Sequence, residues 1–193
     1  MSERQVGVLA LQGDFALHAE LLAGLGVGVQ KVRRPSELDG CDGLIVPGGE
    51  STTLRKLMAR SGLDEAIVEF AREHAVFGTC AGCILLATDL VDAGGVEPLG
   101  LLDVTVHRNA YGRQVDSFEA DVDVPEIGAP PVRGVFIRAP RYVSVGPDVR
   151  VLGRFEDAPV VVRRERTLAL TFHPELTGDT RIHEYFLKMI AEG

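Results

Sequence analysis

Residues 75–87 read AVFGTCAGCILLA and pass from a short apolar strand, 75–78, through a glycine-flanked turn into an apolar helical run, 84–87. A buried apolar strand that leads straight into a helix is typical of a parallel sheet covered by helices. Upstream, the same alternation predicts strands at 6–11, 29–32 and 43–46, and helices at 17–25, 52–60 and 63–74. The chain is therefore expected to form an α/β fold of three layers, with a mostly parallel central sheet and helices on both of its faces.

The second half of the chain changes character. Strand patterns broken by turn residues fall at 104–107, 118–124, 132–137, 149–155, 160–163 and 168–171, with no long helix among them. This predicts additional, partly antiparallel strands. An amphipathic helix over Thr180 to Ala191, with Asp179 as its N-cap, follows. Because no linker, repeat or low-complexity segment interrupts the chain, we expect a single domain over residues 1–193.

Composition excludes several classes of protein. Hydrophobic residues make up 46% and charged residues 25% of the 193 residues, unlike disordered or fibrous proteins. The net charge of −8 repels phosphate backbones, so we expect no nucleic-acid partner. No apolar run approaches the roughly 20 residues that cross a bilayer, and no signal-peptide pattern is present. Three cysteines, an odd number, favour a reducing compartment. We therefore expect a cytoplasmic protein with no membrane association.

The turn Gly78-Thr79-Cys80-Ala81-Gly82 has the form of a nucleophile elbow with cysteine in the nucleophile position. Glycines two residues to either side leave room for a tight strand-to-helix turn, which lifts the Cys80 sulfur out of the sheet. The N-terminus of the following helix favours a thiolate there and can stabilise an oxyanion. Cys80 is thus the predicted nucleophile, and the alternative is a buried structural cysteine in a glycine-rich loop.

A nucleophilic cysteine needs a base, and the base needs a group that orients it. His173 follows the apolar strand 168–172, which places it at the carboxyl end of a strand, where α/β sheets carry their sites. Pro174 keeps His173 extended, so His173 and Glu175 face the same side. The pair is predicted to be base and orienter; the alternative is a solvated loop.

The other histidines are weaker candidates for the base. His18, His74 and His183 lie in helical patterns and are expected to be surface or half-buried residues, and His107 ends a strand.

A second glycine-rich loop, Pro47-Gly48-Gly49-Glu50-Ser51, also follows an apolar strand and precedes a helix. Its glycines let the backbone approach a ligand closely, and its N–H groups are candidates for an oxyanion hole. The alternative is a turn in which Ser51 or Thr52 caps the next helix. Both interpretations can hold together.

Cys80 and Cys83 also form a C-x-x-C pair. A redox dithiol would use the same helix N-terminus, and a zinc site would need further ligands such as Cys41 or His173. The flanking glycines favour the elbow, with Cys83 as a small core residue. We therefore expect no metal and no cofactor.

Together these motifs resemble the class I (triad) glutamine amidotransferases, which have a flavodoxin-like fold, and within them the glutaminase subunits of pyridoxal 5′-phosphate synthase. The elbow and the His-x-Glu motif are shared by the wider superfamily, whereas other stretches are specific to the glutaminase subunits. The resemblance covers nearly the whole chain and rests on residues 7–13 (GVLALQG), 47–53 (PGGESTT), 77–82 (FGTCAG), 112–118 (GRQVDSF), 134–140 (GVFIRAP) and 172–176 (FHPEL).

The resemblance implies a role for each matching residue. It implies Cys80 as nucleophile, His173 as base and Glu175 as orienter. Glutamine would be bound by Gly49, Glu50, Ser51, Arg108, Ile137 and Arg138, and the oxyanion hole would be formed by Gly48, Gly49 and Ala81. A guanidinium such as that of Arg138 suits an α-carboxylate.

The expected activity is hydrolysis of L-glutamine to glutamate and ammonia. The resemblance implies that ammonia passes to a separate synthase subunit, in a large hetero-oligomeric complex, which makes pyridoxal 5′-phosphate. Three alternatives remain open: a glutaminase of another pathway, a stress-response protein with an elbow cysteine, and a C-x-x-C redox protein. Stress proteins of that kind pair the cysteine with a glutamate and lack a downstream His-x-Glu, so Glu175 argues against them.

Overall fold

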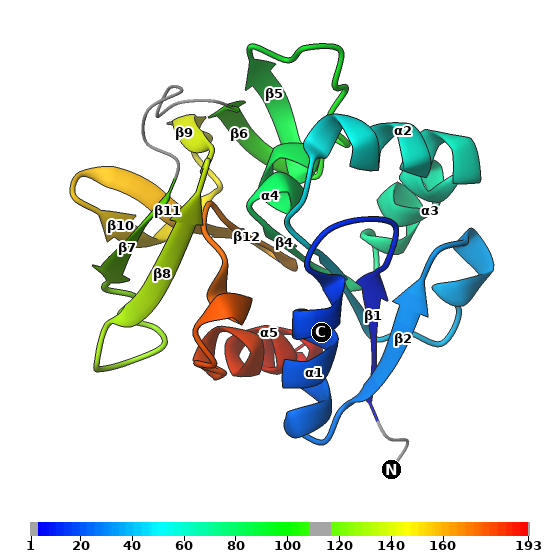
Figure 1. Ribbon diagram of the computed structural model, residues 1–193, viewed down its shortest axis with the longest axis horizontal. Helices are drawn as coiled ribbons and strands as arrows, with labels where there is room; N and C mark the ends of the chain where they lie inside the picture. Colours follow the sequence, from blue (N-terminus) through cyan, green and yellow to red (C-terminus); the bar gives the residue numbers. More distant parts are fainter. Residues whose placement is uncertain (1–3, 109–116, 193) are drawn as a thin grey trace.

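A computed structural model describes residues 4–108 and 117–192, and in them a seven-stranded sheet has the order β10-β11-β12-β4-β3-β1-β2 (Figure 1). Its strands are β1 (Gln5–Leu9), β2 (Gly28–Val32), β3 (Gly43–Val46), β4 (Ala75–Thr79), β10 (Arg150–Phe155), β11 (Ala158–Arg164) and β12 (Thr167–Leu170). The five strands from β12 to β2 are parallel, and β10 and β11 add an antiparallel hairpin at one edge. The predicted mostly parallel sheet is confirmed.

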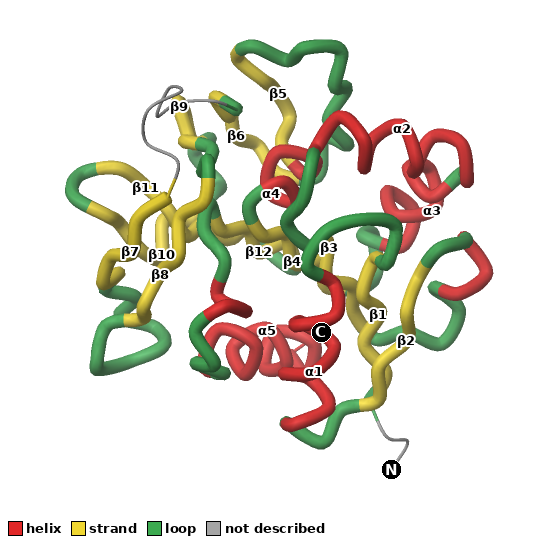
Figure 2. The backbone as a smooth tube through the Cα atoms, in the orientation of Figure 1, coloured by secondary structure: helices red, strands yellow, loops and turns green. Residues whose placement is uncertain are grey.

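Helices cover both faces of this sheet, as the apolar strands predict (Figures 1 and 2). They are α1 (Phe15–Gly24), α2 (Ser51–Ser61), α3 (Leu63–Phe70), α4 (Ala81–Leu86) and α5 (Arg181–Glu192), with single 3-10 turns at η1 (Pro35–Glu37) and η2 (Pro174–Leu176). Neighbouring residues of one strand enter different cores, because successive side chains of a strand point to opposite faces. Ile45 packs with Leu22 of α1 and Phe186 of α5, whereas Val46 packs with Leu54 of α2 on the opposite face.

The second half of the chain adds two smaller sheets beside the central one. They contain β5 (Ala87–Val91), β6 (Leu102–His107) and β9 (Arg141–Val145) in one sheet, and β7 (Ser117–Val122) with β8 (Val132–Ile137) in the other. The expected antiparallel pairing holds for β6–β9 and β7–β8, while β5 pairs with β6 in parallel. Strands β5 and β9 are absent from the sequence-based expectation, because each buries only one residue fully and so lacks a clear alternation.

Local boundaries differ from expectation by a few residues. Helix α3 ends at Phe70 rather than His74, and α4 begins at Ala81, directly after the elbow, rather than at Ile84. Helix α5 begins at Arg181, and the Asp179 carboxylate accepts a hydrogen bond from its backbone N–H at 3.0 Å.

The capping of α2 also differs from expectation. Glu50, and neither Ser51 nor Thr52, is the N-cap: its two carboxylate oxygens accept the backbone N–H groups of Thr52 at 3.0 Å and Thr53 at 2.7 Å. A carboxylate can satisfy both of these free donors at once, which a single hydroxyl oxygen does less well. Partial burial opposes the charged form of Glu50, but these hydrogen bonds outweigh it and lower its pKa to about 2.

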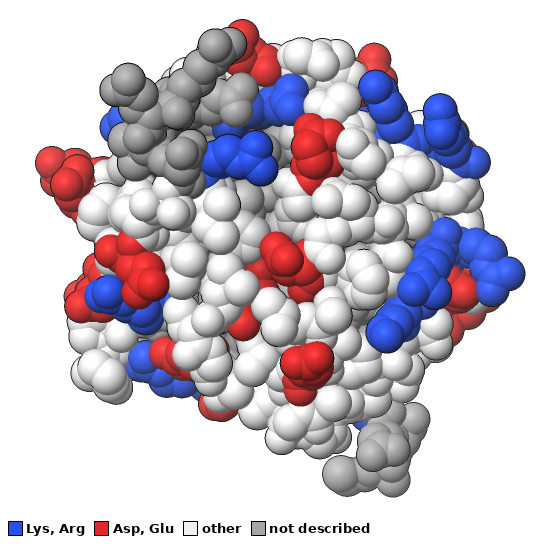
Figure 3. Space-filling view, in the orientation of Figure 1, with Lys and Arg blue, Asp and Glu red and all other residues white. Residues whose placement is uncertain are grey.

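Charged side chains are mixed over the surface. On the face shown in Figure 3, lysine and arginine side chains lie in separate groups with acidic side chains among them. Within residues 4–108 and 117–192, the helices lack the length and apolar composition that crossing a membrane requires.

The carboxyl ends of three neighbouring strands meet at one edge of the sheet. In register, Val46 of β3 lies beside Gly78 of β4, and Leu170 of β12 lies beside Thr79. The loops that follow these strands carry the predicted nucleophile, base and glycine-rich turn. Close backbone packing holds them together, since a Cβ on Gly82 would lie 2.0 Å from the carbonyl oxygen of Val46.

This packing predicts that Gly82→Ala destabilises the protein. The obstacle is a backbone atom, so overpacking should cost about 1–3 kcal/mol, which for a chain of this size lowers the melting temperature by several degrees, roughly 2–4 °C per kcal/mol. Gly24→Ala is the matched control, because a Cβ there meets nothing within 4 Å and the site is helical. Calorimetry of both variants checks this, and an unchanged Gly82→Ala protein would contradict the packing.

The cap predicts a pH-dependent loss of stability in Glu50→Ala. Removing an N-cap costs about 1 kcal/mol, or roughly 2–4 °C in melting temperature at pH 7. Because the folded pKa is lowered from 4.5 to about 2, the carboxylate stabilises fully above pH 4.5 and loses its effect as pH falls toward 2. Melting curves of wild type and variant should therefore converge in acid. Glu20→Ala, on the exposed side of α1, is the control, and a pH-independent gap would contradict the assignment.

Candidate active site

Cys80 occupies a strained turn between β4 and α4. Its backbone has φ 49° and ψ −106°, a conformation that non-glycine residues rarely adopt and that is found mainly at functional sites. Gly78 and Gly82 make the turn possible, since a Cβ on Gly78 would lie 2.8 Å from the carbonyl carbon of Gly82. The residue is 7% exposed, and its sulfur lies 3.8 Å from the carbonyl oxygen of Ile137. The elbow geometry expected from the sequence is present.

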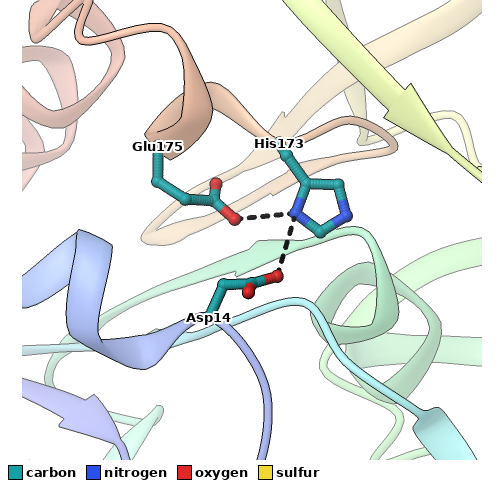
Figure 4. Close-up of side chains that lie close together, drawn as sticks. All are labelled: Asp14, His173 and Glu175. Carbon is teal, nitrogen blue, oxygen red and sulfur yellow. Dashed lines mark hydrogen bonds and ion pairs between the residues drawn. The ribbon is translucent and has the colours of Figure 1, made fainter. Parts of the chain in front are cut away.

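His173 and Glu175 lie on the neighbouring strand end, after β12. The backbone N–H of His173 donates to the Val135 carbonyl oxygen at 2.8 Å, which fixes this segment against β8. Imidazole Nδ1 of His173 lies 2.7 Å from Oε1 of Glu175, and both residues are buried (Figure 4). The alternative of a solvated loop is therefore wrong, and the two side chains share one face as the His-Pro-Glu spacing predicts.

The surroundings of His173 favour its protonated form. Burial opposes the charge, but interactions with Cys80 and with Glu175 outweigh burial and raise the pKa of His173 to about 10. A histidine held between a thiol and a carboxylate can accept the proton of the thiol at Nε2, while the carboxylate keeps the other proton on Nδ1.

Asp14, at the start of α1, also approaches this histidine. Its Oδ2 lies 3.7 Å from Nδ1 of His173, and Figure 4 shows both carboxylates directed at the same ring nitrogen. Ligand atoms of Asp14, His173 and Glu175 all lie within 4.8 Å of one another, a spacing that a metal ion can use. An ion there would have to replace the short His173–Glu175 hydrogen bond, so the arrangement fits an oriented base better than a metal centre.

The loop 47–49 packs directly against the imidazole. A Cβ on Gly48 would lie 2.3 Å from Cε1 of His173, so only glycine fits there. The Gly48 carbonyl oxygen accepts a long hydrogen bond, 3.4 Å, from the backbone N–H of Asp14. Gly49 has φ 152°, which side chains rarely adopt. The sequence-predicted loop therefore lies beside His173, as expected.

Arg108 connects the same loop to β6. Its guanidinium donates to the hydroxyl oxygens of Ser51 and Thr52, each at 3.0 Å, and lies 3.9 Å from the Glu50 carboxylate. A further bond runs to the Ala93 carbonyl oxygen. These contacts hold the guanidinium against the start of α2.

A cavity of about 280 Å³ joins these groups. This is close to the lower end of the roughly 300–1,000 Å³ that small-molecule sites occupy. The predicted site residues that line the cavity are Gly49, Glu50, Ser51, Cys80, Ala81, Arg108, Ile137, Arg138 and His173. The other two, Gly48 and Glu175, contact the His173 ring and do not line the cavity. Of the motif 112–118, only Ser117 and Phe118 fall within the described residues.

Sequence reasoning missed Gln12, Gly13 and Asp14, which line the cavity from the β1–α1 loop. The Gln12 side-chain oxygen accepts the backbone N–H of Glu50 at 2.8 Å. The available signal was their position directly after an apolar parallel strand, where loops at the carboxyl edge of a sheet carry ligands.

The expectation for His18 and His183 is wrong. Both rings are fully buried, on α1 and α5, and contact each other. The helical spacing contained a signal: His18 lies four residues before Leu22, and His183 three before Phe186, and both of these partners are core residues. His74 is half-buried as expected and stacks on Phe70. His107 lies 4.0 Å from Asp92 and does not line the cavity.

Cys83 is fully buried one turn into α4, and burial raises its pKa. A thiol in this state is a poor nucleophile and a poor resolving partner. Its packing position agrees with the expected core role.

Comparison with known proteins agrees with this geometry. A model of the SNO glutamine amidotransferase family matches residues 8–192. A protein of Desulforudis audaxviator, the pyridoxal 5′-phosphate synthase subunit PdxT, is 52% identical over 187 residues, 96% of this chain and 98% of that protein. PdxT of Thermotoga petrophila is 50% identical over 187 residues, 96% of this chain and 99% of that protein.

Solved structures extend the likeness to three dimensions. The crystal structure of a glutamine amidotransferase superposes with a TM-score of 0.92 at 48% identity, covering 96% of this chain and 98% of that one. The structure of PurLQS from Thermotoga maritima shares the fold, with a TM-score of 0.71 at 19% identity over 97% of this chain and 99% of that one. The family match over residues 8–192, the sequence identity to PdxT proteins and the superposition show that this chain belongs to the SNO glutamine amidotransferase family.

Proposed function

We propose that this protein hydrolyses L-glutamine to L-glutamate and ammonia through Cys80, His173 and Glu175. The observation that carries the proposal is the buried 2.7 Å bond between His173 and Glu175, beside a cysteine in a strained elbow at the same sheet edge. A nucleophile, a base and an orienter in this order can break an amide bond.

In the first half of the reaction, the thiol proton of Cys80 lies on His173, whose protonated form the surroundings favour, and the sulfur attacks the side-chain amide carbon of glutamine. His173 then gives the proton to the leaving nitrogen, and ammonia departs from a glutamyl thioester. In the second half, His173 takes a proton from water, whose oxygen attacks the thioester carbon. The C–S bond breaks, glutamate is released, and His173 returns the proton to the Cys80 sulfur. Throughout, the Glu175 carboxylate holds Nδ1–H and so keeps Nε2 available for these transfers.

The negative charge that develops on the amide oxygen during attack needs hydrogen-bond donors. Ala81 begins α4, and the first N–H groups of a helix have no acceptor within it. We assign the oxyanion hole to this end of α4 and to the 48–49 peptide, because Gly48 packs on His173 and Gly49 lines the cavity. Such donors are worth about a hundred- to a thousand-fold in rate each.

Substrate binding is assigned to Gly49, Glu50, Ser51, Arg108, Ile137 and Arg138, all of which line the cavity. Arg138 lines the cavity with an exposed side chain, and a guanidinium there suits the α-carboxylate of glutamine. Glu50 and Arg108 also hold the start of α2 in place beside the cavity, because Glu50 caps this helix and Arg108 donates a hydrogen bond to Ser51.

The ammonia is proposed to serve a synthase partner that makes pyridoxal 5′-phosphate, within a large hetero-oligomeric complex. The names of relatives that are 50–52% identical over 96% of the chain, pyridoxal 5′-phosphate synthase subunits, support this partner. We further propose that residues 1–193 are one glutaminase domain, in agreement with a family match over 8–192. A cytoplasmic location is proposed from the three free cysteines.

The two cysteines of the elbow are expected to respond differently. Cys80→Ala should lower glutaminase turnover by more than about a thousandfold, because no nucleophile remains, while the melting temperature stays close to that of wild type. Cys83→Ala should keep most of the activity, since that thiol only packs. Ammonia release in the presence of the synthase subunit measures both. A Cys83→Ala protein as inactive as Cys80→Ala would favour a redox dithiol instead.

We expect the partner to switch the site on. Rotation of the 48–49 peptide would break only the long bond from Asp14 to the Gly48 carbonyl, and Gly49 tolerates the φ values that rotation requires. Rotation exchanges an N–H for a carbonyl oxygen at the oxyanion hole, so docking that selects the N–H should raise kcat by on the order of a hundredfold. Glutamine KM should change less.

The measurement is steady-state ammonia release at saturating glutamine while the synthase subunit is titrated in. An isolated chain that already turns over at the full rate would contradict this mode of control and favour a stand-alone amidohydrolase.

A further inference from the structure

The carboxylate of Glu175 has a second oxygen that the proposed mechanism does not use. Oε1 pairs with His173, whereas Oε2 is buried and has no well-aligned hydrogen bond among the described residues. Nε2 of His18 lies 3.3 Å from this oxygen, and the side chains of both residues are fully buried. This nitrogen stabilises the buried carboxylate oxygen only if it carries a proton.

A second histidine decides which nitrogen of His18 carries the proton. Nδ1 of His18 lies 2.9 Å from Nε2 of His183, so one donates and the other accepts. If His18 donated through Nδ1, the Thr79 hydroxyl could donate to the unprotonated Nε2, but Nε2 and the Glu175 oxygen would be two acceptors 3.3 Å apart and would repel each other. If His183 donates through Nε2, His18 carries its proton on Nε2, directed at Glu175. Only the second arrangement places a proton between His18 and the carboxylate oxygen.

The surroundings keep both rings neutral and in place. Burial, with smaller effects of His183 and His173, lowers the pKa of His18 well below its usual range. Burial also lowers the pKa of His183 to about 4, although the nearby charge of Asp179 acts to raise it.

Neighbouring side chains hold the two rings in position. The Thr79 hydroxyl lies 3.3 Å from Nε2 of His18, and the ring of Phe77 makes edge contacts with both histidines. The chain His173–Glu175–His18–His183 thus runs from the cavity into the core between α1 and α5.

We propose that His18 is a positioning residue for catalysis: its Nε2–H, held in that tautomer by His183, fixes the free oxygen of Glu175 and thereby the orientation of the His173 base. The predicted effect on kcat rests on the proposed glutaminase activity. The tautomer assignment of His18 and His183 does not. It requires no contact between His18 and substrate.

The kinetic test compares His18→Leu with His18→Gln in the complex with the synthase subunit. A glutamine side chain can place its amide N–H₂ near the position of imidazole Nε2, whereas leucine offers no donor. Loss of a hydrogen bond to a charged group should lower kcat of His18→Leu about ten- to a hundredfold and leave KM within about twofold, and His18→Gln should recover most of kcat. The matched control is His74→Leu, whose ring stacks on Phe70 away from the cavity, and which should keep wild-type kinetics.

Equal losses in the leucine and glutamine variants, or a folded His18→Leu protein with wild-type kcat, would overturn the proposal. Wild-type complex is assayed first: an absence of ammonia release there refutes the proposed function and not this inference.

A spectroscopic test does not depend on activity or on a variant that folds. Long-range ¹H–¹⁵N correlation spectra of the wild-type chain near neutral pH should show both His18 and His183 as neutral Nε2–H tautomers. A His18 ring protonated on Nδ1 would refute the proposal outright.

Discussion

Everything at the site depends on three neighbouring parallel strands, β3, β4 and β12, that end at the same edge of the sheet. Parallel pairing brings the loops after residues 46, 79 and 170 side by side, although they are far apart in the chain. The glycines then set how closely these loops approach. Gly82 leaves no room for a Cβ against the carbonyl of Val46, and Gly48 leaves none against the ring of His173. A side chain at either position would displace Cys80 or His173, so the site geometry depends directly on the sheet packing.

Burial shapes the electrostatics of the proposed catalytic groups and also makes them destabilising to the fold. A buried carboxylate is destabilising unless its charge is paired and hydrogen-bonded. Glu175 is buried on the α1–α5 side of the sheet, where His173 reaches one oxygen and His18 lies near the other. The strained backbone of Cys80 adds a second local cost, which the packed β4–α4 junction must offset. Four buried polar side chains, His18, His173, Glu175 and His183, therefore lie at or directly behind the candidate active site.

Local sequence patterns predicted most elements and the placement of Cys80, His173 and Glu175 well, because an elbow and a His-Pro-Glu turn are each built from a few consecutive residues. Long-range pairing was harder to predict. His18 and His183 are 165 residues apart and meet only because α1 and α5 cover the same sheet face. Strands β5 and β9 bury too few side chains to leave a period-two pattern. The cap of α2 was assigned to a hydroxyl because propensity favours serine and threonine, yet the longer carboxylate of Glu50 reaches both donors.

The central claim is that Cys80 alone is the nucleophile toward glutamine. Its most direct test is covalent labelling with an electrophilic glutamine analogue, such as a diazo ketone, in the presence of the synthase subunit. Fragment mass spectra that separate Cys80 from Cys83 locate the label. We predict one adduct per chain, on the Cys80 sulfur, formed in step with the loss of activity and prevented by excess glutamine. A label on Cys83 or Cys41, or inactivation with Cys80 unmodified, would contradict the account.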